Sequence, residues 1–381
     1  MFLPNKLPFV GTTIFTVMSA LAQQHQAINL SQGFPDFDCS PDLIDWVNHF
    51  IKKGYNQYAP MTGVQVLREQ IAEKATQLYG FTCNPDTDVT VTSGATEALF
   101  AAIAAVVEKG DEVIIFEPAY DSYKPAIALC GGITVPIALQ APHYQIDWQE
   151  VAQKISPKTK LFILNTPHNP TGTTATQTDM LALAKLVRNT NIFLIGDEVY
   201  EHIIFDNEQH QSLLLYPDLA ARSFVISSFG KTFHTTGWKV GYCVAPAELS
   251  KEFRKVHQYL TFSTATPFQY AIAEYLKNPT NYLSLPAFYQ ERRDKFLNLL
   301  KGTKFKLHPA AGTYFQLVDY SAISQEKDTD FAVRLTKEIG VAAIPVSVFY
   351  SENVPQGQYL RFCFAKKDET LEKATERLHK L

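Results

Sequence analysis

The sequence predicts an α/β protein with a large domain, built on a mostly parallel central sheet covered by helices, and a smaller α+β domain. Short apolar runs recur through the middle of the chain, and several are nearly continuous, which is typical of strands covered on both faces. Helical stretches lie between these runs, as in a parallel sheet with crossover helices. After about residue 271 the pattern changes to a long helix, two strands and an amphipathic end helix. In a chain of 381 residues we therefore expect a large domain at 41–281 and a small domain made of 1–40 and 282–381.

Two helices are expected before the sheet. Ser40 is placed to cap the first helix, Pro41 suits its first position, and Gly54 follows its end. The apolar side chains expected on one face of this helix are Leu43, Trp46, Val47, Phe50 and Ile51. The second helix is expected from Thr62 to Tyr79, where Gly80 stops it.

Strands are expected at the apolar runs of the middle of the chain. The six runs are Val89–Thr92, Val113–Phe116, Leu161–Leu164, Ile192–Ile195, Phe224–Ile226 and Val240–Val244. Helices are expected between them, among others at 96–107 and 179–187. The two later strands are expected at 314–318 and 359–364.

The composition excludes several classes of protein. Hydrophobic residues make up 46% and charged residues 19%, which excludes a disordered or fibrous chain. The net charge is −4, so the sequence gives no electrostatic reason to expect nucleic acid or an anionic membrane as a partner. No run approaches about 20 apolar residues, and we therefore expect no transmembrane helix.

The cysteines and histidines indicate no metal site. The five cysteines are scattered, odd in number and form no C-x-x-C pair, which favours reduced thiols. His168, His202 and His234 are expected to be loop or supporting residues rather than metal ligands. The stretch 20–22 resembles a signal-peptidase site, but prolines and polar residues interrupt the apolar segment before it. We therefore expect a cytoplasmic protein.

Chemically useful side chains follow the predicted strands, where ligands collect in open α/β sheets. The first strand leads into Ser93–Glu97, where small residues at a helix start allow backbone N–H groups to reach a phosphate. Later strands lead to a rigid turn with Asn169 and to Asp197, a carboxylate that needs a cation or strong donors if buried. Another leads to Lys231, and a desolvated lysine forms Schiff bases with carbonyls. Each feature alone also fits an ordinary turn, a helix cap or a surface charge.

Taken together, these stretches resemble the class I/II pyridoxal-phosphate-dependent aminotransferases of fold type I. The resemblance covers essentially the whole chain and rests on NLSQGFPDFD at 29–38, NQYA at 56–59, HNPTG at 168–172, DEVY at 197–200, SFGKT at 228–232, GWKVGY at 237–242 and YLRFCF at 359–364. These motifs look most like the subgroup that contains methionine aminotransferases and kynurenine/glutamine transaminases. The resemblance implies pyridoxal 5′-phosphate as cofactor and a ping-pong transfer of an amino group from an amino-acid donor to a 2-oxo acid acceptor.

The resemblance assigns catalytic roles to Lys231, Asp197 and Tyr200. Lys231 would bind the cofactor aldehyde as a Schiff base and, once released by the substrate, would move the proton from the substrate Cα. Asp197 would pair with the pyridine nitrogen and keep it protonated, which makes the ring an electron sink. Tyr200 and Asn169 would hydrogen-bond the phenolic oxygen of the ring, and Tyr120 would stack on its face.

The resemblance also implies how the phosphate is held and how subunits combine. The expected phosphate-binding residues are Ala95, Thr96, Ser228 and Lys239. Many relatives have arginine at the position of Lys239. Here the ammonium of a lysine would replace a guanidinium that can donate two parallel hydrogen bonds to the phosphate. Tyr58 matches a tyrosine contributed by the neighbouring subunit, which implies a homodimer with shared active sites.

Arg361 matches the arginine that binds the substrate α-carboxylate, with Gly33 and Asn169 beside it. Dicarboxylate-specific relatives use a second arginine, but no arginine occurs between Lys255 and Arg292. The expected walls of the side-chain pocket are apolar or aromatic: Ile14, Phe15, Phe34 and Tyr120. A thioether fits such walls, so we expect methionine first, with phenylalanine, tyrosine, histidine, glutamine or kynurenine as weaker donors.

Three alternatives compete with this interpretation. A nicotinamide-dependent oxidoreductase is disfavoured because no G-x-G-x-x-G follows a strand. A ligand-sensing module of a transcription regulator would carry a DNA-binding extension and would lose the lysine, but Lys231 is present. A kynurenine/glutamine transaminase with β-elimination of cysteine conjugates keeps the cofactor, and the motifs do not separate it from transamination of methionine.

Overall fold

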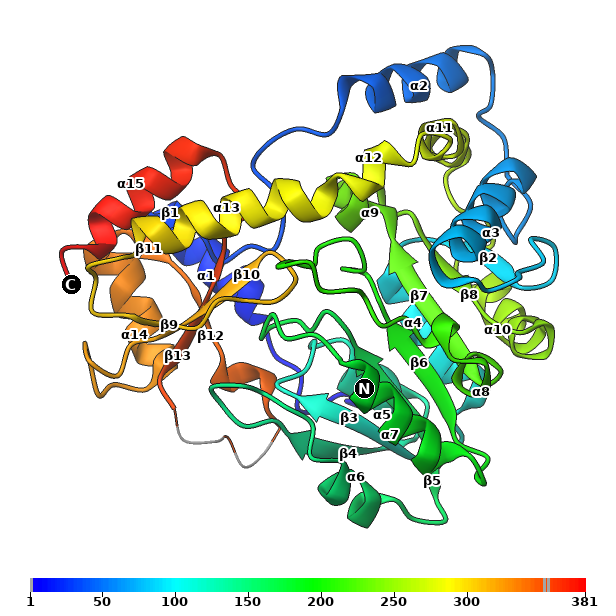
Figure 1. Ribbon diagram of the computed structural model, residues 1–381, viewed down its shortest axis with the longest axis horizontal. Helices are drawn as coiled ribbons and strands as arrows, with labels where there is room; N and C mark the ends of the chain where they lie inside the picture. The colour runs from blue at the N-terminus through cyan, green and yellow to red at the C-terminus, as the bar shows by residue number, and fades with distance from the viewer. Residues whose placement is uncertain (1–2, 352–353, 355–356) are drawn as a thin grey trace.

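The computed structural model describes residues 3–351, 354 and 357–381. Its largest element is a seven-stranded sheet in the order β2-β8-β7-β6-β5-β3-β4 (Figure 1). The strands are β2 (Val89–Thr92), β3 (Glu112–Glu117), β4 (Ile133–Ala138), β5 (Thr159–Asn165), β6 (Phe193–Asp197), β7 (Ser223–Ser228) and β8 (Gly241–Val244). β8 runs antiparallel to both of its neighbours, and the other pairs are parallel. The prediction of an α/β fold with a mostly parallel sheet is confirmed.

Helices cover both faces of this sheet (Figure 1). The helices in this part of the chain are α2 (Pro41–Lys52), α3 (Gln65–Tyr79), α4 (Ala95–Val106), α5 (Tyr123–Leu129), α6 (Trp148–Lys154), α7 (Gln177–Val187), α8 (Pro217–Ala220), α9 (Phe229–Thr232), α10 (Ala247–Leu260), α11 (Thr266–Leu276) and α12 (Thr280–Leu283). Of these, α2 packs on α11 rather than on the sheet. Successive strand residues point to opposite faces, so Ile115 and Ile163 share one apolar core with Leu99 of α4. Ile114 and Phe162, one position away, belong to the core on the other face.

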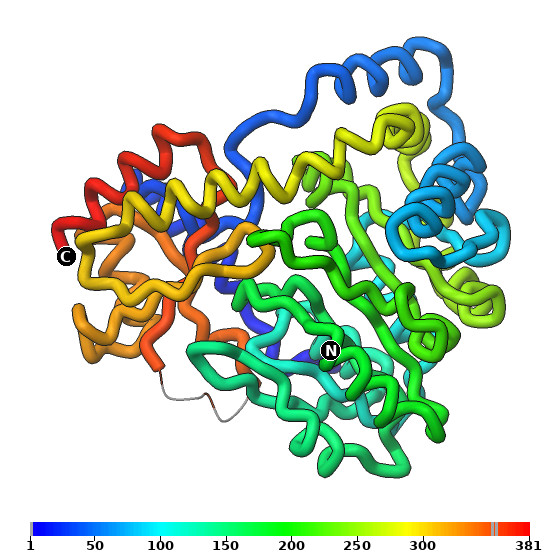
Figure 2. The backbone as a smooth tube through the Cα atoms, in the orientation of Figure 1, coloured from blue at the N-terminus to red at the C-terminus, as the bar shows by residue number. Residues whose placement is uncertain are grey.

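The remaining chain forms a second, smaller group of elements. Its strands β12 (Ile344–Pro345), β13 (Tyr359–Cys363), β10 (Phe315–Asp319) and β9 (Lys306–Leu307) form an antiparallel sheet in this order, and β1 (Ile28–Asn29) pairs in parallel with β11 (Val341–Ala342). Its helices are α1 (Ile14–Gln24), α13 (Leu285–Leu299), α14 (Asp328–Arg334) and α15 (Asp368–Leu378). Figure 2 shows the blue N-terminal segment beside the orange and red C-terminal segments before it crosses to α2.

Several element boundaries differ from the sequence prediction. The second predicted helix begins at Gln65 rather than Thr62, because Gly63 adopts a left-handed conformation with φ +97°. The single long helix expected after residue 271 is three helices, because Pro279 lies at the break between α11 and α12 and Pro286 lies at the start of α13. Ser40 makes no side-chain cap, although Pro41 is the first residue of α2 as expected.

The expected apolar face of α2 is only partly buried. Leu43, Val47 and Phe50 are buried, whereas Trp46 is 38% and Ile51 43% exposed. Figure 1 shows α2 on the outside of the molecule next to α11, and a helix with one neighbour buries only a narrow stripe.

Strand β4 was not predicted. Its sequence contains Pro136, which lowers the strand propensity of the segment, and β4 lies at the edge of the sheet, where proline is tolerated.

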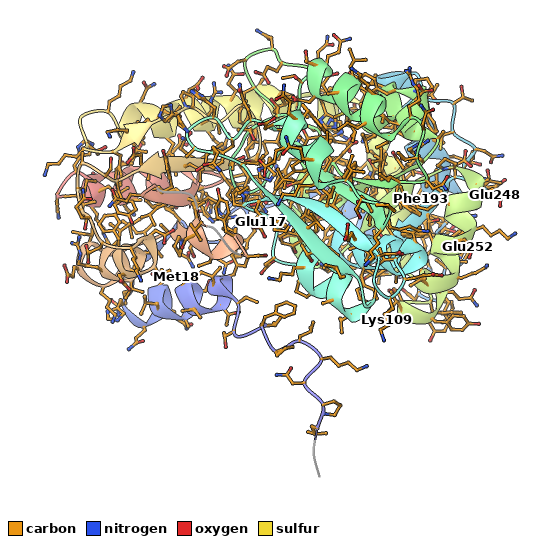
Figure 3. The ribbon with its side chains drawn as sticks, turned by 90° about the horizontal axis from the view of Figure 1, so that it is seen from below. Met18, Lys109, Glu117, Phe193, Glu248 and Glu252 are labelled. Carbon is orange, nitrogen blue, oxygen red and sulfur yellow. The ribbon has the colours of Figure 1, made fainter. Side chains whose placement is uncertain are left out.

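Residues 3–13, before α1, extend away from the rest of the molecule (Figure 3). Leu3, Phe9 and Val10 are exposed, while Met18 of α1 is buried against the body of the protein. Within the described residues, no helix has the length and apolar character needed to cross a membrane.

Candidate active site

A pocket lies at the carboxyl ends of the central strands. Asp197 and Ser228 are the last residues of β6 and β7, and both line it. Because β8 is antiparallel, its first residue lies at the same edge, and Lys239, two residues earlier, also reaches the pocket. The structure brings together nine predicted cofactor-binding residues in its lining: Ala95, Thr96, Tyr120, Asn169, Asp197, Tyr200, Ser228, Lys231 and Lys239.

Asp197 is 3% exposed and carries one free carboxylate oxygen. Its Oδ2 accepts a hydrogen bond from the hydroxyl of Tyr123, and its Oδ1 has no partner among the described residues. Burial raises the pKa of Asp197 to about 6, against the opposing effect of the Tyr123 hydrogen bond. A buried oxygen without a donor is costly, so Oδ1 is suited to a donor supplied by a bound group. Tyr123 was not predicted.

Lys231, in the short helix α9, has its amine inside the protein. Its Nζ donates to the Tyr314 hydroxyl at 2.8 Å and to the Gly33 carbonyl at 3.2 Å. Burial lowers the pKa of Lys231 to about 8, which makes its neutral, nucleophilic form accessible. Tyr314 was not predicted either, because it stands outside the motifs.

Positive and donor groups gather at the start of α4. Gly94 precedes this helix with φ +76° and leaves room for Lys239, whose Nζ would lie 3.2 Å from a Cβ at this position. At Gly241 a Cβ would lie 2.9 Å from the Ala95 nitrogen, so only glycine lets β8 approach this turn. Amides at a helix start, an ammonium and the nearby Ser228 hydroxyl form a suitable site for a phosphate.

Arg361 of β13 is 1% exposed and makes no ion pair with a carboxylate of the described residues. Its Nη1 donates to Asn169 Oδ1 at 2.8 Å, its Nη2 donates to the Ser31 carbonyl at 3.2 Å, and its Nε has no partner in the described part of the chain. The guanidinium carbon lies 3.9 Å from the centre of the Phe315 ring. Burial lowers the pKa of Arg361 to about 10, so it stays charged near neutral pH. A buried cation of this kind needs an anion, which a substrate carboxylate would supply.

The other predicted site residues do not line the pocket. Gly33 reaches it only through its hydrogen bond with Lys231. Phe15 lies near Arg361, with 5.3 Å between its ring centre and the guanidinium carbon, and Ile14 is half-buried. Phe34 is 46% exposed. Tyr58 is 82% exposed, so any contribution it makes to an active site would have to be to that of another subunit.

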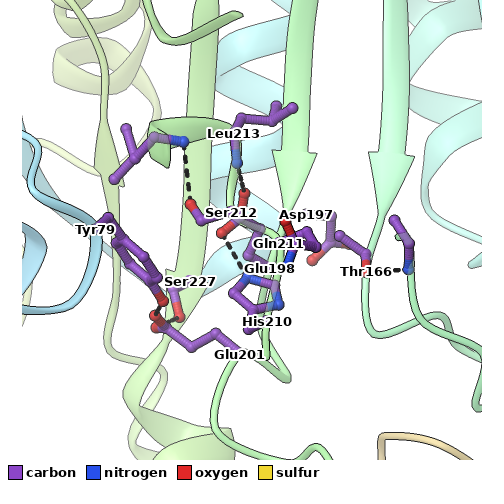
Figure 4. A network of polar contacts seen from close by, with 12 residues as sticks. Tyr79, Thr166, Asp197, Glu198, Glu201, His210, Gln211, Ser212, Leu213 and Ser227 are labelled. Atoms are coloured by element: carbon purple, nitrogen blue, oxygen red, sulfur yellow. Dashed lines mark hydrogen bonds and ion pairs between the residues drawn. The ribbon is translucent and has the colours of Figure 1, made fainter. Parts of the chain in front are cut away.

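Beside the pocket lies a buried network that sequence analysis missed (Figure 4). Glu201 accepts hydrogen bonds from Lys74 Nζ at 2.7 Å, Ser227 Oγ at 2.7 Å, Tyr242 Oη at 2.9 Å and Tyr79 Oη at 2.5 Å. Burial acts to raise the pKa of Glu201, but the charge of Lys74 and the hydrogen bonds from Lys74 and Ser227 hold it well below its ordinary value. The network therefore ties the loop after β6 to β7, β8 and α3.

The pocket fits the cofactor that the motifs imply. The free Asp197 oxygen suits a protonated ring nitrogen, the Lys231 amine suits an aldehyde, and the α4 start with Lys239 suits a phosphate.

Comparison with known proteins agrees with this fit. Residues 25–378 match the family model for aminotransferase class I and II. A methionine aminotransferase of Escherichia coli strain K12 is 58% identical over 378 residues, which cover 99% of this chain and 98% of that protein. The human kynurenine–oxoglutarate transaminase 1 is 34% identical over 396 residues, covering 94% of this chain and 93% of that protein.

Similar solved structures are also aminotransferases. A crystal structure from Escherichia coli, described as identifying a methionine aminotransferase function, has a TM-score of 0.98 at 57% identity and covers 100% of both chains. An N-succinyldiaminopimelate aminotransferase from Mycobacterium tuberculosis has a TM-score of 0.96 at 38% identity, again with 100% of both chains. This chain therefore belongs to the class I and II aminotransferases, which are pyridoxal-phosphate-dependent enzymes of fold type I.

Proposed function

We propose that this enzyme transfers the α-amino group of methionine, and more slowly that of aromatic or other large neutral amino acids, to a 2-oxo acid. The observation that carries the proposal is the gathering of Lys231, Asp197 and the α4 start in one pocket, with the buried Arg361 reached from it through Asn169. The 58% identity with a methionine aminotransferase supports the choice of donor.

Pyridoxal 5′-phosphate, when bound, supplies a ring that takes up the electron pair released at the substrate Cα. Asp197 would accept a hydrogen bond from the ring nitrogen through its free Oδ1. Tyr200 and Asn169 would bond the phenolic oxygen of the ring, and Tyr120 would cover its face. The α4 amides of Ala95 and Thr96, the Ser228 hydroxyl and the Lys239 ammonium would hold the phosphate.

Lys231 would serve first as the attachment point and then as the base. Since its pKa is lowered to about 8, a useful fraction of the free amine is neutral near neutral pH and able to accept the proton from the substrate Cα. Arg361, with Gly33 and Asn169 beside it, would hold the substrate α-carboxylate and thereby orient the Cα–H bond.

The choice of a neutral donor follows from the missing second arginine. Burying the side-chain carboxylate of aspartate without a cation would cost roughly a thousandfold or more in specificity. Phe15 and Phe34, together with Ile14 and Tyr120, are the proposed walls for an unbranched thioether.

Domain organisation and assembly belong to the same proposal. Residues 41–281 would bind the cofactor, and 1–40 with 282–381 would form the small domain that carries Arg361. A homodimer would place Tyr58 in the neighbouring active site, which the high exposure of this side chain supports. A cytoplasmic location is supported by the five free, scattered cysteines.

The test is a panel of amino-acid donors, all assayed with the same 2-oxo acid acceptor. The absorbance change of the cofactor reports the reaction of each donor. We expect kcat/KM for methionine to exceed that for aspartate by about a thousandfold. An equal or better value for aspartate would refute the proposed pocket. Release of pyruvate and ammonia from a cysteine conjugate, faster than amino transfer from methionine, would favour β-elimination instead.

A further inference from the structure

Tyr314 lies between the amine of Lys231 and the carbonyl of Gly33. The tyrosine is fully buried, and its oxygen lies 2.8 Å from Lys231 Nζ and 2.5 Å from the Gly33 oxygen. The Lys231 Nζ also lies 3.2 Å from the same carbonyl. The three polar atoms therefore form a closed triangle.

The donors and acceptors of this triangle can be assigned. A carbonyl oxygen only accepts, so the Tyr314 hydroxyl donates its proton to Gly33 and offers a lone pair to Lys231. A neutral amine has two N–H bonds and one lone pair. Tyr314 and Gly33 together take both N–H bonds, and the lone pair is left to point elsewhere. Lys231 lines the pocket, whereas neither Tyr314 nor Gly33 does, so the open direction is the pocket.

The ring of Tyr314 is held firmly enough to fix its hydroxyl. It packs edge-on against Tyr200 with 5.2 Å between ring centres, and in a tilted arrangement against Tyr289 with 5.8 Å. Its backbone carbonyl accepts from the Phe364 amide at 3.0 Å. The backbone at Gly33 lies close to the Phe315 ring, since a Cβ at this position would lie 2.8 Å from it.

We propose that Tyr314 is a positioning residue that holds the free Lys231 amine with its lone pair directed at the substrate Cα. This inference rests on the proposed function of Lys231. The Lys231 nitrogen takes the proton from Cα and becomes an ammonium with three N–H bonds. Two of these remain on Tyr314 and Gly33, and the third carries the proton that Lys231 would give to the aldehyde carbon of the cofactor. The electron pair of the Cα–H bond would be taken up by the cofactor ring, so no co-reactant is needed.

Other charged and titratable groups also face the Lys231 amine. Asp197 favours its protonated form, and Lys239 and Arg361 favour its neutral form. Cys363 of β13 lies nearby, and the Tyr200 ring centre is 5.6 Å from Nζ. The test must therefore compare variants that leave all of these groups in place.

The variant is Tyr314→Phe and its matched control is Tyr289→Phe. Both remove one buried phenol hydroxyl from neighbouring rings, but the Tyr289 hydroxyl has no partner in the described part of the chain. The first measurement follows the absorbance of the cofactor-free full chain as it binds pyridoxal 5′-phosphate at a series of pH values. Loss of an acceptor destabilises the ammonium more than the amine, so Tyr314→Phe should lower the midpoint of the rate–pH profile by roughly 1. Tyr289→Phe should leave the midpoint unchanged, and an unchanged midpoint in Tyr314→Phe overturns the proposal.

The second measurement is a single turnover of the loaded enzyme with methionine and with methionine deuterated at Cα. In Tyr314→Phe we expect a rate about 10- to 100-fold lower, a larger isotope effect, and an apparent Kd for methionine within about threefold of the parent. An equal loss in both variants would indicate general loosening of the site and would also overturn the proposal. Borohydride labelling separates a failure of the proposed function of Lys231 from a failure of the positioning role of Tyr314. If it marks a lysine other than Lys231, the proposed function itself fails.

Discussion

The guanidinium of Arg361 and the side-chain amide of Asn169 are joined by a hydrogen bond of 2.8 Å. The backbone nitrogen of Asn169 donates to Asn165, and the Asn165 amide donates to the backbone oxygen of Asp197, each at 2.8 Å. The proposed carboxylate-binding residue and the proposed partner of the ring nitrogen are therefore connected through the end of β5. This connection links the small sheet to the large one at the pocket.

Replacement of Lys231 by alanine should abolish turnover while leaving the cofactor bound without a covalent link. A positioned base contributes about 10²–10⁴-fold, and loss of the attachment point adds to this. Borohydride reduction followed by peptide mapping checks the assignment, because the parent should be labelled at Lys231 and the variant should not be labelled at all.

Asp197 should give the cofactor-free protein a pH-dependent stability. Its folded-state pKa of about 6 lies above the ordinary value of 3.8, so the folded protein holds an extra proton between these values. Stability should therefore fall by roughly 3 kcal/mol as the pH rises from about 4 to about 6. Thermal unfolding across this range should show that Asp197→Asn lacks this component. In the loaded enzyme the same substitution should strongly reduce the rate of transamination. Near-normal activity would contradict the proposed pairing of Asp197 with the ring nitrogen.

Tyr58 should act across the subunit boundary. If each active site takes Tyr58 from the partner subunit, mixing inactive Tyr58→Ala and Lys231→Ala proteins should restore up to one functional site per mixed dimer. The recovery is measured as activity after subunit exchange has been verified by mass. No recovery would mean that Tyr58 acts within its own chain or does not act.

The Lys74–Glu201 pair should be a major contributor to stability. Both side chains are at most 5% exposed, and removing one partner of a buried pair costs about 3–5 kcal/mol. Glu201→Gln should therefore lower the free energy of unfolding by about that amount in denaturant titrations. The control is Glu252→Gln, which breaks the exposed Lys255–Glu252 pair and should change stability by less than about 1 kcal/mol. Equal effects of the two substitutions would contradict this expectation.

The sequence predicted the strand ends well because apolar runs and the polar residues after them are both local signals. Asp197 and Ser228 come two residues after such a run and Lys231 five residues after one, and all three reach one pocket. Tyr123 and Tyr314 were missed because the chain has 18 tyrosines and nothing local distinguishes these two. Their importance arises only where segments far apart in sequence meet, as Tyr314 and Gly33 do.

Pro136, which lowered the strand propensity of β4, also has a consequence for solubility. β4 is an edge strand, and an edge strand exposes backbone groups on which a strand of another molecule could add. Pro136 has no N–H, so any such added strand would meet a missing donor in the middle of β4. The same residue that weakens the strand as a local signal thus makes the edge of the sheet a poor template for aggregation.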